Sequence, residues 1–334
     1  MGIATTDLAV RESPWAKARQ LFARQPILGP FGALVVLCVF FSLASSTFLS
    51  IDNFSTILQQ IVVVATLALG QTLIILTAGI DLANGAILVL GTLVMAKVAT
   101  AGSGSPILGL LLGLIVCVVV ATVSGLLVTS VKLPPFIVTL GMLAVVVAIA
   151  NLYSGGTTTQ ADSGLLTWLG TTKYLFGRAP FTYGIFLAAG LYLIVGLMLA
   201  KTAWGKHVYA VGGDIDAARL TGIRINRTTA SVYALAGLVY GFGAWLALGR
   251  APTADPNAYQ TGNLDSITAV VIGGTSLFGG RGGVVGTVIG ALIVAVLRSG
   301  LTQMGIDSNY QNLATGALVI LAVAFDQATR RVKA

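Results

Sequence analysis

Charged residues are scarce in this sequence. They make up 9% of its 334 positions, whereas hydrophobic residues make up 56%. Because an ordinary soluble domain carries about a quarter of charged residues, this chain could not cover a globular surface with polar groups. The composition argues against a soluble protein and predicts that lipid is its main solvent.

The residues of catalysis are also scarce. His207 is the single histidine, and Cys38 and Cys117 fall inside apolar runs, where a thiol usually behaves as a small hydrophobic group. The sequence has no G-x-x-x-x-G-K-[ST] phosphate loop and no histidine or cysteine cluster spaced for a metal. We therefore predict no catalytic residue, no metal site and no enzyme.

Basic residues outnumber acidic ones, and the formal net charge is +8. The lysines and arginines are scattered singly between apolar runs, so they do not form the basic face with interleaved aromatics that binds nucleic acid. We predict no nucleic-acid partner and interpret these charges as signals of membrane topology.

Apolar runs of about 20 residues, the length that crosses a bilayer, follow one another along the chain. They predict an all-α fold, a polytopic transmembrane helix bundle of about ten spans. The spans lie near 28–49, 57–78, 83–100, 106–130, 135–153, 181–200, 229–249, 264–278 (short), 284–300 and 310–328.

The ends of the chain are predicted to be cytoplasmic. Residues 1–27 are too long and too mixed for a signal peptide and form a tail, residues 28–328 form the transmembrane domain, and residues 329–334 form a second tail. With both tails inside, most lysines and arginines fall in cytoplasmic loops, as the positive-inside rule requires. The largest of these loops is 201–228.

Uncharged polar residues inside the predicted spans are the candidates for a translocation path for a neutral polar solute. Ionisable residues such as Asp81, Asp265 and Arg298 fall at predicted span ends, which disfavours a proton-driven carrier. The alternative role of each polar residue is a hydrogen bond between helices or to the i−4 carbonyl. The candidates are Gln59, Gln60, Gln71, Thr72, Thr139 and Asn151.

The cytoplasmic loop is predicted to contain a short helix from Asp214 to Leu220. Asp214 can accept hydrogen bonds from its first amides, Asp216 complements its positive end, and Gly222 supplies a left-handed turn at its end. Such a helix can act as a rigid lever outside the membrane, or it can be a simple connector.

Four separated motifs resemble those of one transporter family. The run GQTLIILTAGIDLANG at 70–85 resembles the signature of the sugar-type permeases of ATP-binding-cassette importers, the ribose, xylose, arabinose and galactose group. Three further stretches agree in order and spacing: PFIVTLGM at 135–142, YAVGG leading into AARLTGI at 209–223, and LDSITAVVIGGTSLFGGRG at 264–282. The resemblance spans most of the chain.

The resemblance implies a permease of about ten helices per subunit in the bacterial cytoplasmic (inner) membrane, working as a homodimer or heterodimer in lipid. It also implies a periplasmic or lipid-anchored solute-binding protein and a cytoplasmic ATPase, which binds ATP and Mg, so that this chain needs no cofactor. In such permeases a coupling helix docks into the ATPase, and the matching residues here are Gly213, Asp214, Asp216, Ala217, Ala218, Arg219, Leu220, Thr221, Gly222 and Ile223. The turns that would flank the dock contain Gly79, Asp81, Gly279, Gly280 and Arg281; the alternative is that they are hairpin turns that only fix helix ends.

Departures from the family pattern leave the solute open. Ala83 and Asn84 stand where the signature usually has Ser-Val, and Asn263 stands where members often have Glu. A monosaccharide is the first expectation. The alternatives are a branched-chain amino-acid permease of the same wider family, a permease for nucleosides, inositol or furanosyl signalling molecules, and a stand-alone secondary carrier or channel.

Overall fold

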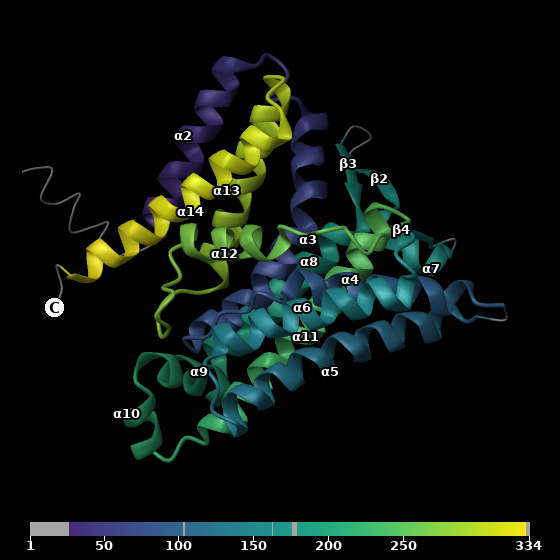
Figure 1. The fold of residues 1–334 in the computed structure, drawn as a ribbon. Coiled ribbons are helices and arrows are strands. Elements are labelled where there is room, and N and C mark those ends of the chain that lie inside the picture. Colours follow the sequence, from purple (N-terminus) through teal and green to yellow (C-terminus); the bar gives the residue numbers. More distant parts are fainter. Residues whose placement is uncertain (1–26, 103, 162, 176–178, 332–334) are drawn as a thin grey trace, which may run out of the picture.

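The computed structural model describes residues 27–102, 104–161, 163–175 and 179–331. The N-terminal tail predicted at 1–27 therefore lies almost entirely outside the described residues, as do the last three residues of the tail predicted at 329–334. The described chain is mainly helical (Figure 1).

Each predicted span corresponds to one helix. The first half contains α2 (Leu28–Ala44), α3 (Ile51–Leu76), α4 (Asn84–Thr100), α5 (Pro106–Ser130) and α6 (Pro135–Ser154). The second half contains α8 (Tyr183–Lys201), α11 (Ile225–Arg250), α12 (Gly262–Ile272), α13 (Val284–Gln303) and α14 (Ser308–Arg331), with α9 (Ala203–Gly213) and α10 (Ile215–Leu220) in the predicted loop.

Local sequence signals fix several helix ends. Ser50 accepts a hydrogen bond from the backbone N–H of Asn53, so α3 begins six residues before the predicted start of its span. Ser105 caps α5 in the same way, and Pro106 occupies its first turn, where the missing N–H costs nothing. The short span predicted at 264–278 is a shorter helix, α12, because the chain turns at Gly273 and Gly274.

Six helices in the described part of the chain are long and apolar enough to cross a membrane: α3, α5, α6, α8, α11 and α13. Three apolar helices, α2, α4 and α12, are shorter. This arrangement confirms a polytopic helical membrane protein.

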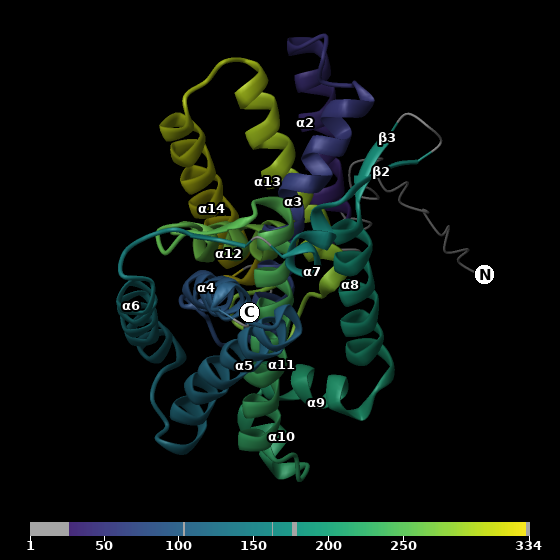
Figure 2. The ribbon, with the colours of Figure 1, turned by 90° about the vertical axis from the view of Figure 1, so that its right-hand side faces the viewer.

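Helix α3 is largely buried and packs against α8, α11, α12 and α13 (Figures 1 and 2). Its second half, from Leu67 to Leu76, is almost fully buried. In contrast, large aliphatic side chains on the outer helices are exposed, including Leu43 on α2, Leu152 on α6 and Ile320 on α14. A surface of this kind fits a hydrocarbon solvent and not water.

Small residues allow the helices to approach closely. A Cβ on Gly237 of α11 would collide with the Cys117 carbonyl of α5, and one on Gly290 of α13 would collide with the Ala269 carbonyl of α12. Such backbone contacts are how membrane helices gain packing energy in lipid.

Four short strands accompany the helices in the described part of the chain. β2 (Thr172–Leu175) and β3 (Ala179–Thr182) form one antiparallel hairpin, and β1 (Thr159–Gln160) pairs with β4 (Thr253–Ala254). β3 packs against α3 and α8, β1 and β4 pack against α4, and α7 (Gly164–Thr167) with the turn Trp168–Gly170 packs against α11 (Figure 2). Segments outside the apolar runs satisfy their backbone groups in this way.

Candidate functional site

The helix predicted in the cytoplasmic loop is α10. The Asp214 side chain accepts hydrogen bonds from the backbone N–H groups of Asp216 (2.9 Å) and Ala217 (3.0 Å). At the other end Gly222 has φ +82°, and the Ile223 N–H donates to the carbonyl of Ala218 at 3.1 Å. The predicted caps are thus both formed, and they make a six-residue helix rigid.

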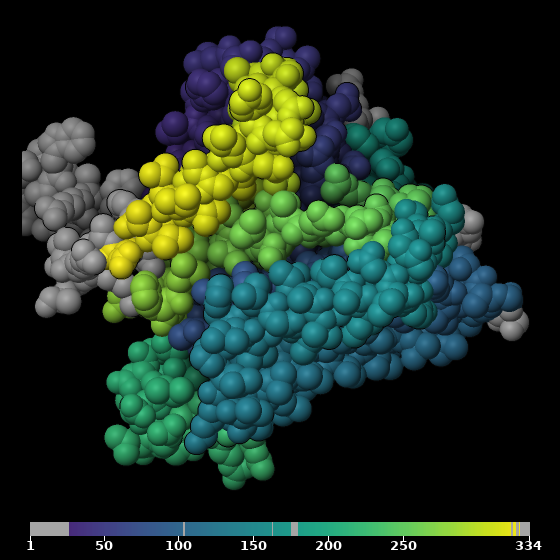
Figure 3. Space-filling view, viewed as in Figure 1, coloured from purple at the N-terminus to yellow at the C-terminus, as the bar shows by residue number. Residues whose placement is uncertain are grey.

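Some side chains of α10 are exposed and one is buried against the rest of the chain. Leu220 is 89% exposed and Ile215 is 48% exposed, while Asp216 and Arg219 form an exposed ion pair at 3.3 Å. Ala218 is buried, so its close contact is made within this chain and not with a partner, which corrects the sequence expectation for this residue. Figure 3 shows α9 and α10 projecting from the body at one end of the molecule.

Three segments that are far apart in the sequence meet at the end of α9. They are residues 76–79, residues 279–283 and the last residues of α9 itself, 209–213, and we call their meeting point the inner junction. The Gly280 N–H donates to the Leu76 carbonyl at 3.0 Å, and the Tyr209 hydroxyl donates to the Gly282 carbonyl at 2.9 Å. Burial raises the pKa of the Tyr209 phenol, which keeps this donor protonated. A Cβ on Gly212 would collide with the Leu76 carbonyl and lie 2.7 Å from the Gly280 nitrogen.

The predicted turn residues divide into exposed and buried ones. Arg281 is exposed, but Gly79, Asp81 and Gly279 are buried. Asp81 Oδ1 accepts from the Ala83 N–H at 2.8 Å, and Oδ2 has no hydrogen-bond partner among the described residues. Asp81 is fully buried and fixes the α3–α4 turn from inside, which is the alternative role that the sequence left open for this turn.

Several of the predicted path residues hold helices together instead. Gln71 is fully buried, its amide lies 3.2 Å from that of Asn84, and Asn84 donates to the Ser266 hydroxyl at 2.8 Å. The hydroxyls of Thr72 and Thr287 are 2.7 Å apart.

Two further path candidates, Thr139 and Asn151, donate hydrogen bonds to backbone carbonyls. Thr139 donates to the Ile80 carbonyl at 2.9 Å, and Asn151 donates to its own helix at the Val147 carbonyl, also at 2.9 Å. The alternative that the sequence left open, hydrogen bonds between or within helices, is the geometry found for these four residues.

Replacing Gln71 with Leu is expected to lower the free energy of unfolding by about 1–3 kcal/mol, because the buried amide of Asn84 loses a partner. Thermal unfolding of the detergent-solubilised protein measures the change. Asn151→Leu is the matched control, since its amide bonds only within α6, and it should shift stability by less than about 0.5 kcal/mol. Equal shifts for both variants would contradict a structural role for Gln71.

The two neighbouring glutamines of α3 face different surroundings. Gln59 Nε2 lies 3.1 Å from the Ser55 hydroxyl and 3.3 Å from the Pro180 carbonyl, so it attaches α3 to the β2–β3 hairpin. Gln60 instead lines a cavity of about 320 Å³, which we call the outer cavity. The other polar residues of its lining are Arg250, Gln260, Thr261, Asp265 and Arg298.

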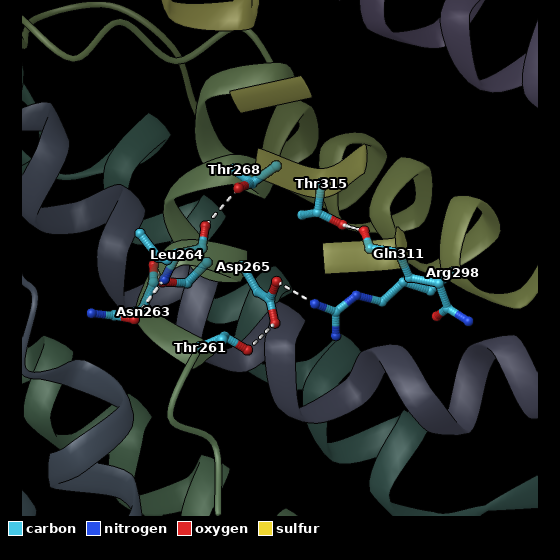
Figure 4. A network of polar contacts seen from close by, with 9 residues as sticks. Thr261, Asn263, Leu264, Asp265, Thr268, Arg298, Gln311 and Thr315 are labelled. Atoms are coloured by element: carbon cyan, nitrogen blue, oxygen red, sulfur yellow. Dashed lines mark hydrogen bonds and ion pairs between the residues drawn. The ribbon is translucent and has the colours of Figure 1, made fainter. Parts of the chain in front are cut away.

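An ion pair closes one side of the outer cavity. Arg298 Nη2 of α13 donates to Asp265 Oδ1 of α12 at 2.7 Å, as Figure 4 shows. Sequence analysis placed both residues at span ends and gave them no role. The sequence does contain a signal for this pair: two consecutive apolar segments carry one acidic and one basic residue. Because charged residues in membranes are usually paired, an ion pair between the two could have been predicted.

The permease components of branched-chain amino acid transport systems form a family that matches residues 53–323. The chain belongs to this family. Curated relatives include the fructose import permease of Rhizobium meliloti, which is 41% identical over 95% of this chain and 90% of its own length. The ribose import permease of Bacillus subtilis is 37% identical (90% and 92% covered), and the galactose/methyl galactoside import permease of Escherichia coli strain K12 is 35% identical (89% and 93% covered). No solved structure matches the chain.

Membership of the permease family accounts for the apolar outer helices and for the lack of catalytic motifs. The chain is a multi-pass permease subunit of the bacterial inner membrane and not an enzyme. The matched residues include α10, the inner junction and the outer cavity, so all three belong to the part of the chain that the permease family shares.

Proposed function

We propose that this chain is the membrane-spanning permease subunit of an ATP-driven importer, and that it translocates a monosaccharide delivered by an extracytoplasmic binding protein. The observation that carries the proposal is α10, a capped helix that projects from the bundle with Leu220 exposed to solvent. An apolar side chain exposed at the end of a rigid helix is suited to docking into a partner's groove. The names of the relatives, which import fructose, ribose and galactose, support the choice of solute.

The proposed topology has ten spans and two cytoplasmic termini. The α3–α4 turn, the α9–α10 segment and the α12–α13 loop meet at one end of the bundle, and the β-strands lie at the other end (Figure 1). The short helices α4 and α12 are largely buried, so neighbouring protein and not lipid surrounds them. With α2 and α14 included, the helices alternate in direction from the first tail to the last.

The proposed partners divide the work with this chain. A cytoplasmic ATPase binds ATP and Mg and receives α10, and the extracytoplasmic binding protein docks at the end that carries the strands. A second permease subunit, identical or different, completes the path. Closure of the ATPase pair moves α10 and the adjoining α9. The inner junction transmits that movement through the Tyr209 bond of α9 to Gly282, before α13, and through the backbone bond of Gly280 to Leu76 of α3.

Reconstitution tests this function directly. The permease, its copurifying ATPase and the binding protein are placed in liposomes, and uptake of labelled fructose, ribose, galactose and leucine is measured with and without ATP. We expect uptake of one sugar that requires ATP and stops when the ATPase is inactivated. Leucine uptake in place of sugar uptake would favour the amino-acid alternative that the family description raises, and uptake driven by a proton gradient alone would exclude an importer of this type.

A further inference from the structure

The outer cavity is lined by both polar and aliphatic side chains. Gln60, Arg250, Gln260, Thr261, Asp265 and Arg298 supply donors and acceptors, and α3 and α13 add aliphatic side chains such as Val64 and Val294. Tyr259 adds an aromatic ring to the lining. A volume of about 320 Å³ lies at the lower end of the range of small-molecule sites, which is roughly 300–1,000 Å³.

The ion pair leaves hydrogen-bonding capacity unused. Arg298 Nε is buried and has no partner among the described residues. Asp265 is almost fully buried, and beyond the Arg298 contact its Oδ2 has only a long 3.5 Å contact with the Thr261 hydroxyl (Figure 4). Buried polar groups normally find partners, so the weakly bonded Oδ2 of Asp265 is suited to accept a hydrogen bond from a ligand.

The charges of the cavity suit a ligand with hydroxyl groups. Asp265 and Arg298 pair with each other at 2.7 Å, so the ammonium group of an amino acid would have to break this bond to gain a carboxylate partner, while Arg250 leaves one positive charge in the lining. A sugar needs no ionic partner, since its hydroxyls can donate to the Asp265 carboxylate and accept hydrogen bonds from Gln60 and Arg250 while the ion pair stays intact. The C–H groups of a sugar ring match the aliphatic wall.

We propose that the outer cavity is a low-affinity monosaccharide site within the permease, occupied after the sugar leaves the binding protein and before it passes the buried half of α3. This inference rests on the proposed function and specifies where the permease itself contacts its substrate. It replaces the path through Gln71 and Thr139, whose side chains are engaged between helices.

Protection of an introduced thiol tests the site. Val64→Cys, made in a Cys38→Ala background, places a thiol at the half-buried wall position, and the native Cys117 is fully buried and needs no change. The permease–ATPase complex in nanodiscs, without binding protein, is treated with a small charged thiol reagent in the presence of fructose, ribose, galactose or leucine at millimolar concentration. We expect one sugar to slow modification, leucine to have no effect, and a thiol introduced by Leu49→Cys in the exposed α2–α3 connection to react equally under all conditions.

A second variant distinguishes binding of the sugar in the cavity from simple blocking of the path to the thiol. Gln60→Leu in the same background removes an amide that lines the cavity and should raise the sugar concentration for half-protection about fivefold. Gln59→Leu changes the adjacent residue, which lies outside this cavity and bonds the β2–β3 hairpin, and should leave that concentration unchanged.

The outcomes of these experiments test the site separately from the proposed function. No protection by any sugar, in a complex whose ATP-driven sugar uptake is intact when the binding protein is added, would overturn the site and leave the importer standing. Protection by leucine alone would overturn the sugar assignment of the cavity. Equal effects of Gln60→Leu and Gln59→Leu would show that the cavity wall does not contact the sugar.

Discussion

Leu220→Asp is expected to abolish ATP-driven uptake while leaving the permease folded. Leu220 is 89% exposed at the end of α10, so the substitution removes almost no internal packing and should change the free energy of unfolding by less than about 0.5 kcal/mol. At a docked interface the same carboxylate would be desolvated without a partner. We expect affinity for the ATPase to fall at least about 30-fold, or about 2 kcal/mol, as measured by copurification and by ATPase stimulation in nanodiscs.

Two control variants make this result specific to α10. Leu220→Met keeps an apolar side chain of similar volume and should retain assembly and uptake. Leu49→Asp places the same charge at another exposed leucine, in the α2–α3 connection, and should not affect ATPase binding. Normal assembly of the Leu220→Asp variant would remove α10 from the coupling role. Ala218 is a poorer test position, because it is buried and a bulky side chain there would disturb the fold of α10 itself.

Gly212→Val is expected to lower the stability of the protein more than a substitution at an exposed residue of the inner junction. The first carbon of the side chain would collide with the Leu76 carbonyl and lie 2.7 Å from the Gly280 nitrogen. These are backbone atoms that cannot rotate away, so we expect a loss of about 3 kcal/mol of stability or more, at the upper end of overpacking effects. Thermal unfolding and size-exclusion chromatography in detergent measure this loss.

The neighbouring glycine supplies the control for that experiment. A Cβ on Gly213 would have no atom within 4 Å, so Gly213→Ala should leave the unfolding temperature unchanged. If Gly212→Val unfolded at the same temperature as Gly213→Ala, the close approach of α9 to the α3–α4 turn would not contribute to stability. If Gly212→Val stayed folded but lost ATP-driven uptake, the junction would act in coupling alone.

The membrane class and the local shape of α10 could be predicted because both depend on interactions within a short stretch of chain. An apolar run of sufficient length partitions into lipid wherever it lies in the fold. The caps of α10 at Asp214 and Gly222 involve residues close in sequence, and both are formed as their residue types predicted. The positive-inside pattern and the four motifs are equally properties of the linear chain.

The roles of the polar residues depended on contacts between distant segments. Gln71 and Gln60 are both glutamines on α3, yet one is bonded to Asn84 in the core and the other lines a cavity with Arg298. The sequence alone determined that this chain crosses a membrane many times and carries a capped helix in its largest predicted cytoplasmic loop. Only the tertiary structure decided which polar groups bond to each other and which face a cavity, because a polar side chain in a membrane interior bonds to whichever partner the packing of other helices brings within about 3 Å.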